Sequence, residues 1–284
     1  MASFTNQATL RYNGLSVASN TVTGQMISPL TVTKTAGDET YAPGDTVSYA
    51  VSLVNDGSAT YEGLTLTDDL GGYDVGAGTA WPLAYVEGSV RYFINGVLQP
   101  APAVTPGQPL IVSGISVPAG GDAMLVYETE VTAAAPLTAG STVVNTASLS
   151  GAGLTAPIEA QATITVQTGP ELSIVKSLSP ATVAQNGQLT YTFVIQNSGN
   201  EEAGAGANVA VSDLFDPVLK DISVTLNGQP LTLTADYTYD QTTGQFDTVA
   251  GQIAVPAATY AQTASTGDWI VSPGEATLVV TGTV

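Results

Sequence analysis

Apolar and polar residues alternate with a period of two along most of this chain. The stretches Val47–Asn55 and Leu189–Asn197, for example, place Val, Tyr, Leu, Phe or Ile at every second position and mostly small or polar residues between them. This period is typical of half-buried β-strands. Gly and Pro punctuate the stretches, and no segment has the spacing of an amphipathic helix. The sequence therefore predicts an all-β protein.

The alternating stretches occur twice, in the same order and with similar spacing. The aligned pairs are Leu30–Lys34 with Leu172–Lys176, Val47–Asn55 with Leu189–Asn197, Leu64–Asp68 with Val209–Asp213, Asn95-Gly96 with Asn227-Gly228, and Ala123–Tyr127 with Ala276–Val280. The Asn-Gly pairs and Asp56-Gly57 are expected to form tight turns. A length of 284 residues suits two domains. Many short strands with frequent turns predict two tandem Ig-like β-sandwich domains.

The two repeats differ at their ends. The first closes with a predicted hairpin, Asn145–Leu149 followed by Ala160–Val166. The second reaches Val284 without such a segment, whereas the head of the chain carries a matching one, Asn6–Leu10 followed by Ser16–Val22. We therefore expect the second sandwich to be incomplete and to be completed by a donor hairpin from another subunit.

This comparison predicts three parts: a donor hairpin over residues 1–28, a complete sandwich over 29–168 and an incomplete, accepting sandwich over 169–284. An incomplete sandwich exposes apolar core and open strand edges, which strand addition can cover. Donation within one chain is disfavoured because the whole first domain lies between head and tail. A contact that does not close on itself generates a filament. The alternative is that the boundaries of the chain are arbitrary, or that its first 28 residues are an unstructured tail. The alternation of Phe4, Asn6, Ala8 and Leu10 argues against such a tail.

The charge balance limits the partners. The chain has 24 acidic and 5 basic residues, for a net charge of −19. Such a surface disfavours nucleic acid, because few cations are present to neutralise phosphates, and it disfavours anionic membranes. No apolar run reaches membrane-spanning length, so no membrane insertion is expected. No secretion signal is visible at the head, which leaves unconventional export, assembly inside a cell, or a removed leader.

The chain contains no Cys and no His. Disulfides, thiol catalysis, the usual zinc sites and His-based triads are therefore excluded, and we expect neither a metal nor another cofactor. A hydrolase with paired carboxylates would need two carboxylates facing one cleft, and the sequence offers no such pair. Any reaction is expected to be a single turnover of the protein on itself.

Three polar residues of the first repeat fall on the apolar faces of their predicted strands: Lys34, Asp68 and Asn145. Burial moves a lysine toward its neutral, nucleophilic form and an aspartate toward its protonated form. A protonated Asp68 could donate a hydrogen bond to the Asn145 carboxamide and stabilise the oxyanion as the amine attacks. Ammonia would leave and an intramolecular isopeptide bond would remain. The alternative is a buried ion pair with Asn145 as a polar neighbour.

The second repeat has Lys176 and Asp213 at the matching positions, but its matching asparagine is Asn6, on the head hairpin. If that hairpin docks in the next molecule, Lys176 of one subunit would meet Asn6 of another, with Asp213 as the promoting acid. The expected product is an intermolecular isopeptide bond and a covalently continuous fibre. An ion pair without a bond is again the alternative.

The order Lys34, Asp68, Asn145 resembles the collagen-adhesin-type isopeptide domains of Gram-positive surface proteins. The strand motifs are also similar to the conserved repeat domain of unknown function that occurs in tandem in long bacterial surface proteins, and this second resemblance covers nearly the whole chain. The resemblance implies an extracellular stalk or fibre role.

The sequence thus predicts a structural subunit that polymerises head to tail by donor-strand complementation and is locked by Lys–Asn bonds. Its partner would be itself, and its location a cell surface or a spore appendage. The alternative is a monomeric adhesin stalk whose loops bind a host or glycan ligand that the sequence does not identify.

Overall fold

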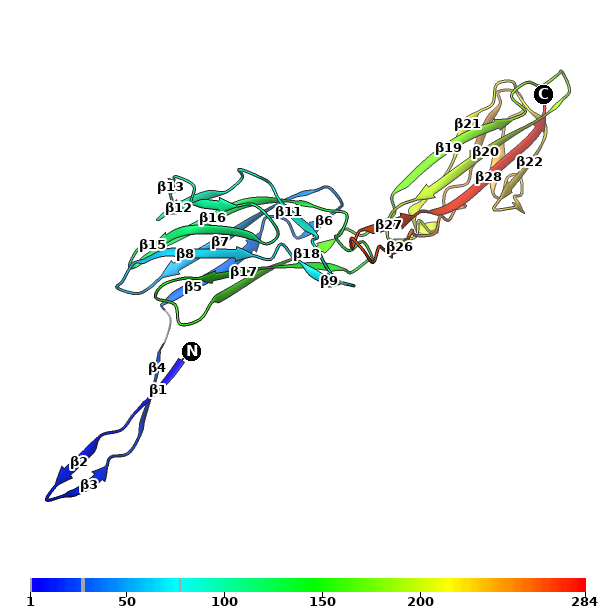
Figure 1. The fold of residues 1–284 in the computed structure, drawn as a ribbon. Helices are drawn as coiled ribbons and strands as arrows, with labels where there is room; N and C mark the ends of the chain where they lie inside the picture. Colours follow the sequence, from blue (N-terminus) through cyan, green and yellow to red (C-terminus); the bar gives the residue numbers. More distant parts are fainter. Residues whose placement is uncertain (1, 27–28, 77) are drawn as a thin grey trace. The chain divides into compact units, whose positions relative to one another are not determined.

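The computed structural model describes residues 2–26, 29–76 and 78–284, and strands run through most of them (Figure 1). No α-helix occurs among these residues, and one 3₁₀ turn covers Ala205–Ala207. The predicted all-β class is confirmed. The chain divides into two compact units: unit 1 holds the residues up to Ala135 with Thr142–Thr165 and Ser265–Gly267, and unit 2 holds Pro136–Ser141, Val166–Ala264 and Asp268–Val284.

Unit 1 is a sandwich of two sheets. The first has the strand order β13 (Val97–Gln99), β12 (Arg91–Ile94), β16 (Gly121–Val131), β7 (Thr46–Asn55), β5 (Leu30–Ala36), and β11 (Leu83–Tyr85) also pairs with β16. The second has the order β14 (Ala103–Thr105), β15 (Leu110–Val117), β8 (Tyr61–Asp68), β17 (Thr142–Ser150), β18 (Ile158–Val166), β6 (Thr40–Tyr41). A short ladder joins β9 (Tyr73–Val75) to β10 (Gly78–Ala80).

The inner faces of these sheets form the core of unit 1. On β7, every second residue from Val47 to Leu53 is buried, and on β8 Leu64 and Leu66 are fully buried. Burial at every second position is what the pleat of a strand produces when one face is covered. The period-two pattern of the sequence therefore marks the core directly.

Unit 2 repeats the first sheet. Its strand order is β19 (Leu172–Ser179), β20 (Gln188–Asn197), β28 (Gly274–Thr283), β22 (Lys220–Leu226), β23 (Gln229–Pro230). Its second sheet has only β21 (Ser212–Leu214), β25 (Gln245–Thr248) and β24 (Tyr237–Tyr239), and β26 (Thr259–Gln262) pairs separately with β27 (Trp269–Ser272). Within the described part of the chain, unit 2 has no counterpart of β17, β18 and β6.

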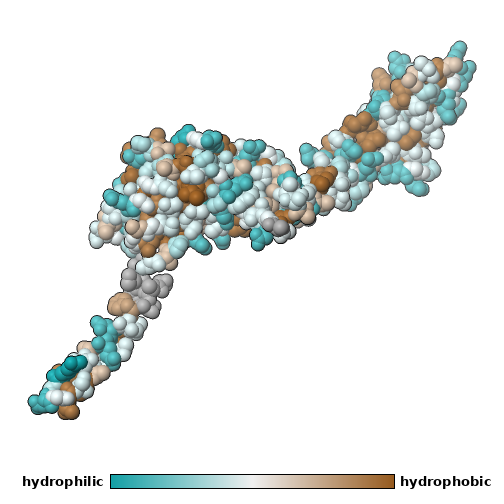
Figure 2. Space-filling model, in the orientation of Figure 1, coloured by the Kyte–Doolittle hydropathy of each residue, from teal (hydrophilic) through white to brown (hydrophobic). Residues whose placement is uncertain are grey.

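The smaller second sheet leaves β19 uncovered. On β5, Leu30 and Val32 are 3% and 8% exposed, whereas on β19 the corresponding Leu172 and Ile174 are 41% and 54% exposed. Leu178 further along β19 is also about half exposed. Figure 2 shows apolar surface where Figure 1 places β19. Unit 2 therefore presents an apolar face that the same fold buries in unit 1.

The head of the chain is a separate hairpin. β1 (Ala2–Asn6) pairs with β4 (Val22–Met26), and β2 (Thr9–Tyr12) pairs with β3 (Leu15–Ala18). Asn13 and Gly14 at its tip have φ of 45° and 78°, as a two-residue hairpin turn requires. The hairpin continues to Met26, beyond the predicted end of its second piece at Val22. Ile27 and Ser28 of the predicted donor segment lie outside the described residues.

One face of this hairpin is apolar and uncovered. A strand alternates its faces, so Phe4, Asn6, Ala8 and Leu10 share one side, and cross-strand partners lie on the same side as each other. A two-stranded hairpin by itself is marginally stable in water. The large apolar residues of the hairpin that are at least half exposed are Phe4, Leu10, Tyr12, Leu15, Val17 and Val22.

Two of the three predicted tight turns occur in the structure. Asn95-Gly96 and Asn227-Gly228 both have positive φ and connect paired strands, as predicted. The prediction that Asp56-Gly57 forms a tight turn is wrong. β7 and β8 belong to different sheets, so the chain after Asn55 crosses from one sheet to the other rather than folding back on itself.

A buried asparagine holds this crossover. The Asn55 Nδ2 group donates to the carbonyl of Ala59 at 2.9 Å and of Pro118 at 2.8 Å, and Oδ1 accepts from the Gly57 N–H at 3.0 Å. Asn197 makes the equivalent set in unit 2 with Glu201, Pro256 and Gly199. Both side chains satisfy loop backbone groups that would otherwise be buried without partners.

We predict that Asn55→Ala lowers the free energy of unfolding of unit 1 by about 2 to 3 kcal/mol, because several backbone groups lose a buried partner. Urea denaturation followed by near-UV circular dichroism measures the change. Ser58→Ala, an exposed change in the same loop, is the control and should stay within about 0.5 kcal/mol of the parent. Equal effects of the two changes would contradict a structural role for the Asn55 amide.

Candidate cross-linking sites

Lys34 and Asp68 form a buried ion pair between the two sheets of unit 1. Lys34 lies on β5 and Asp68 ends β8, and Nζ is 2.6 Å from Oδ2. The two side chains are 0% and 1% exposed. The ring centroid of Tyr49 is 4.8 Å from the ammonium nitrogen. The sequence-predicted burial of Lys34 and Asp68 on facing strands is therefore what the structure shows.

Asp68 has further donors. The Tyr127 hydroxyl donates to Oδ2, the oxygen that also accepts from Lys34, and the Leu70 N–H donates to Oδ1 at 3.0 Å. Tyr127 lies opposite Tyr49 in the register of β16 and β7. Sequence reasoning missed Tyr127, although its place in the alternating pattern of β16 pointed its ring into the core.

The buried surroundings lower the pKa of Lys34 and raise that of Tyr127. Burial is the largest influence on Lys34 and lowers its pKa, while the charge and hydrogen bond of Asp68 and the charge of Asp69 act against that shift. Burial also raises the pKa of Tyr127 well above its usual value, and the Asp68 charge adds to the rise. Tyr127 thus remains a hydrogen-bond donor, and the Lys34 amine is moved toward its neutral form.

Asn145 is buried beside this pair without hydrogen bonds of its own. Among the described residues, neither Nδ2 nor Oδ1 of its fully buried carboxamide has a partner. Ala147, two positions along β17, lies opposite Asp68, so Asn145 and Asp68 share the inner face of adjacent strands. Leaving such a group unpaired costs about 1–3 kcal/mol, and folded proteins rarely do so. The structure thus places an unpaired carboxamide on the same inner face as Asp68, the partner of Lys34.

Asp69 contacts the residue after Asn145, and Tyr49 lies near the Asn145 amide. Asp69 Oδ1 accepts from the Thr146 N–H at 2.8 Å, which ties β17 to the end of β8. Tyr49 also lies close by: burial raises its pKa, and the Asn145 amide is the main influence against that rise. Tyr49 therefore lies near both the Lys34 ammonium and the Asn145 amide.

The second Lys–Asp pair is open to solvent. Lys176 and Asp213 form an ion pair in unit 2, with side chains 40% and 18% exposed. The ammonium nitrogen lies 4.5 Å from the ring centroid of Tyr191 and within 5.6 Å of those of Phe193 and Phe215. The pair therefore resembles the first in its partners but differs from it in burial.

Two residues of the first site have no equivalent in unit 2. Val280 lies opposite Tyr191, the place that Tyr127 occupies opposite Tyr49, so Asp213 lacks a tyrosine donor. No asparagine of the described part of unit 2 occupies the place of Asn145. Its predicted counterpart Asn6 is exposed on β1, opposite Val22 in the hairpin. That Asn6 meets Lys176 of another subunit stays a prediction.

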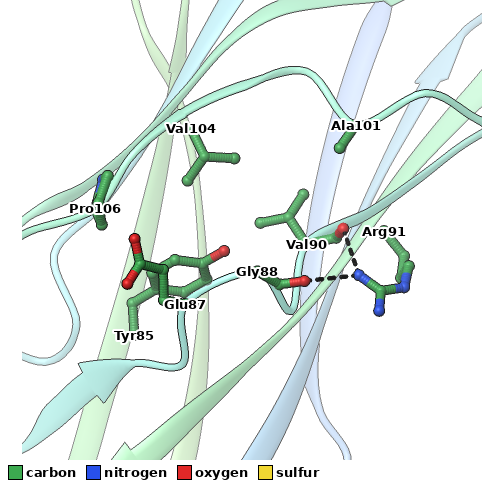
Figure 3. Close-up of a pocket in the computed structure, with 8 residues that line it drawn as sticks. All are labelled: Tyr85, Glu87, Gly88, Val90, Arg91, Ala101, Val104 and Pro106. Atoms are coloured by element: carbon green, nitrogen blue, oxygen red, sulfur yellow. Dashed lines mark hydrogen bonds between the residues drawn. The ribbon is translucent and has the colours of Figure 1, made fainter.

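A separate open pocket of about 310 Å³ lies in unit 1 (Figure 3). Its Arg91 guanidinium donates from Nη1 to the carbonyls of Gly88 at 2.8 Å and Val90 at 3.0 Å. The pocket is lined by an aromatic ring, an acid, a base and several apolar side chains. None of its lining residues belongs to either Lys–Asp site. Its lining residues are Tyr85, Glu87, Gly88, Val90, Arg91, Ala101, Val104 and Pro106.

Two features are absent from the described part of the chain. No group of three or more His, Cys, Asp or Glu side chains there could hold a metal ion. No helix there is long and apolar enough to cross a membrane.

No protein-family model matches this sequence, and no curated protein sequence matches it significantly. Solved structures with a similar fold include the pilus backbone protein of Streptococcus pneumoniae, at 13% identity and a TM-score of 0.36, over 86% of this chain and 55% of that one. The major pilin subunit of Bacillus cereus is similar at 14% identity and a TM-score of 0.34, over 96% and 73% of the two chains. The collagen-binding domain of a Staphylococcus aureus adhesin is similar at 13% identity and a TM-score of 0.29, over 51% of this chain and 100% of that one.

We predict that Lys34→Ala lowers the free energy of unfolding by about 3–5 kcal/mol, because it leaves the Asp68 charge buried and unpaired. The measurement is urea denaturation, made in an Asn145→Ala background so that no chain can carry a Lys34–Asn145 bond. Replacing both partners, as Lys34→Met with Asp68→Leu, should recover most of the loss, since similar volumes are kept. A double variant as unstable as Lys34→Ala would show that the pair is not a simple buried ion pair.

Proposed function

We propose that this chain is the subunit of a surface filament, in which the head hairpin of one copy covers unit 2 of the next. One observation carries the proposal: the chain presents an exposed apolar hairpin and an exposed apolar β19 face, whereas their counterparts in unit 1, the β17–β18 pair and β5, have buried inner faces. Apolar surfaces of this kind favour burial, and exposed strand edges favour strand addition.

The match extends to single positions. In β17, every second residue from Val143 to Leu149 is buried against the core. In the head, Phe4, Asn6, Ala8 and Leu10 follow the same pattern with the same spacing. If the head docks in the register of β17, Ala8 lies opposite Asp213, as Ala147 lies opposite Asp68.

The returning strand of the head also suits this role. Val22 lies opposite Asn6 and Val17 lies opposite Leu10, so each strand adds apolar residues to the same face. The Phe4 ring lies over Gly24, where a Cβ atom would collide with it. A large residue on one strand is thus accommodated by a glycine on the other, and both strands can pack against unit 2.

We further propose that Lys–Asn bonds lock the filament. The neutral lysine amine attacks the Asn carbonyl carbon, the C–N bond to the side-chain nitrogen breaks, and ammonia leaves with the proton that the amine gives up. Asp68 and Asp213 are the promoting acids. The bonds are Lys34–Asn145 within unit 1 and Lys176–Asn6 between subunits. The unpaired carboxamide of Asn145 beside Lys34 supports the first bond, and the alignment of Asn6 with Asn145 supports the second.

A monomeric adhesin stalk is the second candidate. The open pocket at Tyr85 and Arg91 favours it, because a ring, an acid and a base together can recognise a polar ligand such as a glycan. This reading requires saturable ligand binding by a protein that stays monomeric.

Denaturing gel electrophoresis of the assembled protein after boiling tests the intermolecular bond. We expect a ladder that Asn6→Ala and Lys176→Ala each abolish, because each removes one atom of the new bond. Asn20→Ala, an exposed change in the same hairpin, should leave the ladder intact. A single band from protein that shows no filaments by electron microscopy would refute the filament and favour the adhesin stalk.

Intact mass spectrometry tests the intramolecular bond. The Asn6→Ala chain, which cannot join its neighbour, should be lighter by one ammonia than its sequence requires. The Asn6→Ala, Asn145→Ala double variant should have its full mass. An Asn6→Ala chain at full mass would mean that Lys34 and Asn145 stay unbonded.

A further inference from the structure

The two Lys–Asp pairs of this protein differ in one physical respect. The pair in unit 1 is shielded from water, and the pair in unit 2 is open to it, with the lysine 40% exposed. The first already has the surroundings that disfavour charge. The second would acquire them only when another molecule covers β19.

The surroundings of the open pair are ones that stabilise charge. Lys176 keeps contact with water, faces the carboxylate of Asp213, and lies over three aromatic rings whose faces attract a cation. A protonated amine has no lone pair with which to attack a carbonyl carbon. The exposed site of a free subunit is therefore held in an unreactive state.

The head hairpin would change this without adding compensating charge. Residues 1–28 contain no Asp or Glu, and Arg11 is their only charged side chain. The apolar face that carries Phe4, Asn6 and Leu10 would replace water around Lys176 with hydrocarbon and one carboxamide. Removing an ion pair from water is expensive, whereas the neutral amine and carboxylic acid tolerate burial.

We propose that docking of the head hairpin is itself the trigger of the intermolecular bond: on burial, one proton passes from Lys176 Nζ to Asp213, and the neutral amine then attacks Asn6. This inference rests on the proposed donor-hairpin assembly. The step balances, because the proton moves within the pair, the Nζ–Cγ bond forms, the Cγ–Nδ2 bond of Asn6 breaks, and ammonia leaves. Only subunits that are seated in the right register become locked.

This trigger has a distinctive dependence on pH. The ion pair and the neutral pair hold the same number of protons, so their ratio does not depend on the pH of the solution. An exposed amine would instead have to lose its proton to water, and its reactive fraction would rise about tenfold per pH unit below the usual lysine pKa of about 10.4.

The groups that face Lys176 do not complicate this expectation. They are Asp213 from β21, Tyr191 and Phe193 from β20, and Phe215 after β21. Phe246 of β25, opposite Asp213, is apolar. The apolar face of the hairpin adds Tyr12 as its only titratable side chain.

The test mixes two full-length variants. A Lys176→Ala chain can only donate Asn6, and an Asn6→Ala chain can only accept at Lys176, so boiled samples of the mixture contain covalent dimers and nothing longer. The rate constant for dimer formation is measured at rising concentration until it becomes independent of concentration, which isolates the step after docking. We expect this limiting rate constant to change by less than about threefold between about pH 6 and about pH 9.

A tenfold rise per pH unit would overturn the trigger while leaving the filament and its cross-link in place. Filaments without covalent dimers would overturn both the trigger and the cross-link but not strand donation. Absence of both filaments and dimers would overturn the proposed function itself.

A second variant tests burial directly. Phe4→Ala on the donor chain leaves Asn6 in place but removes apolar cover, so the limiting rate constant should fall by about tenfold or more even at saturation. Thr5→Ala, on the opposite face of the same strand, is the matched control and should leave it within about twofold. A Phe4→Ala donor that binds more weakly yet reacts at the parental limiting rate would contradict the proposal.

Discussion

An apolar sheet face must be covered, and the organisation of this molecule depends on that requirement. In unit 1 the inner faces of β5 and β7 in one sheet, and of β17 and β18 in the other, are buried, and the core closes. In unit 2 the same first sheet meets a second sheet of only three strands, and β19 remains exposed. The head hairpin likewise has an apolar face that no other strand covers. In the proposed filament, each of these two faces would cover the other.

The same requirement governs the polar chemistry. A charged lysine and aspartate are stable at the edge of water and costly inside a core. In unit 1 the closed sandwich has lowered the pKa of Lys34 and left Asn145 without hydrogen bonds. In unit 2 the pair stays solvated and is stabilised by aromatic rings. One set of residue types is thus shielded from water or open to it according to whether the strands beside it are in place.

The sequence anticipated most of the elements and part of the site. Alternation located the long strands, and the alignment of the repeats agrees with the register, since Lys34 faces Val51 as Lys176 faces Phe193. The sequence did not reveal that the Tyr127 hydroxyl donates to Asp68. The alternating pattern marks a tyrosine as a core residue but does not show which group its hydroxyl contacts. Asp56-Gly57 was misread, because a turn dipeptide does not show whether the next strand joins the same sheet.

By itself, the sequence determined the β class, the two repeats, and which residues face inward, since these depend on a period of two that each strand carries locally. The match of Asn6 with Asn145 stays a prediction from the sequence. The tertiary structure alone decided which polar groups are buried and which are open. Burial depends on how many strands from distant parts of the chain pack together. The number of such strands decides why the Lys34 side chain is buried and the Lys176 side chain is exposed.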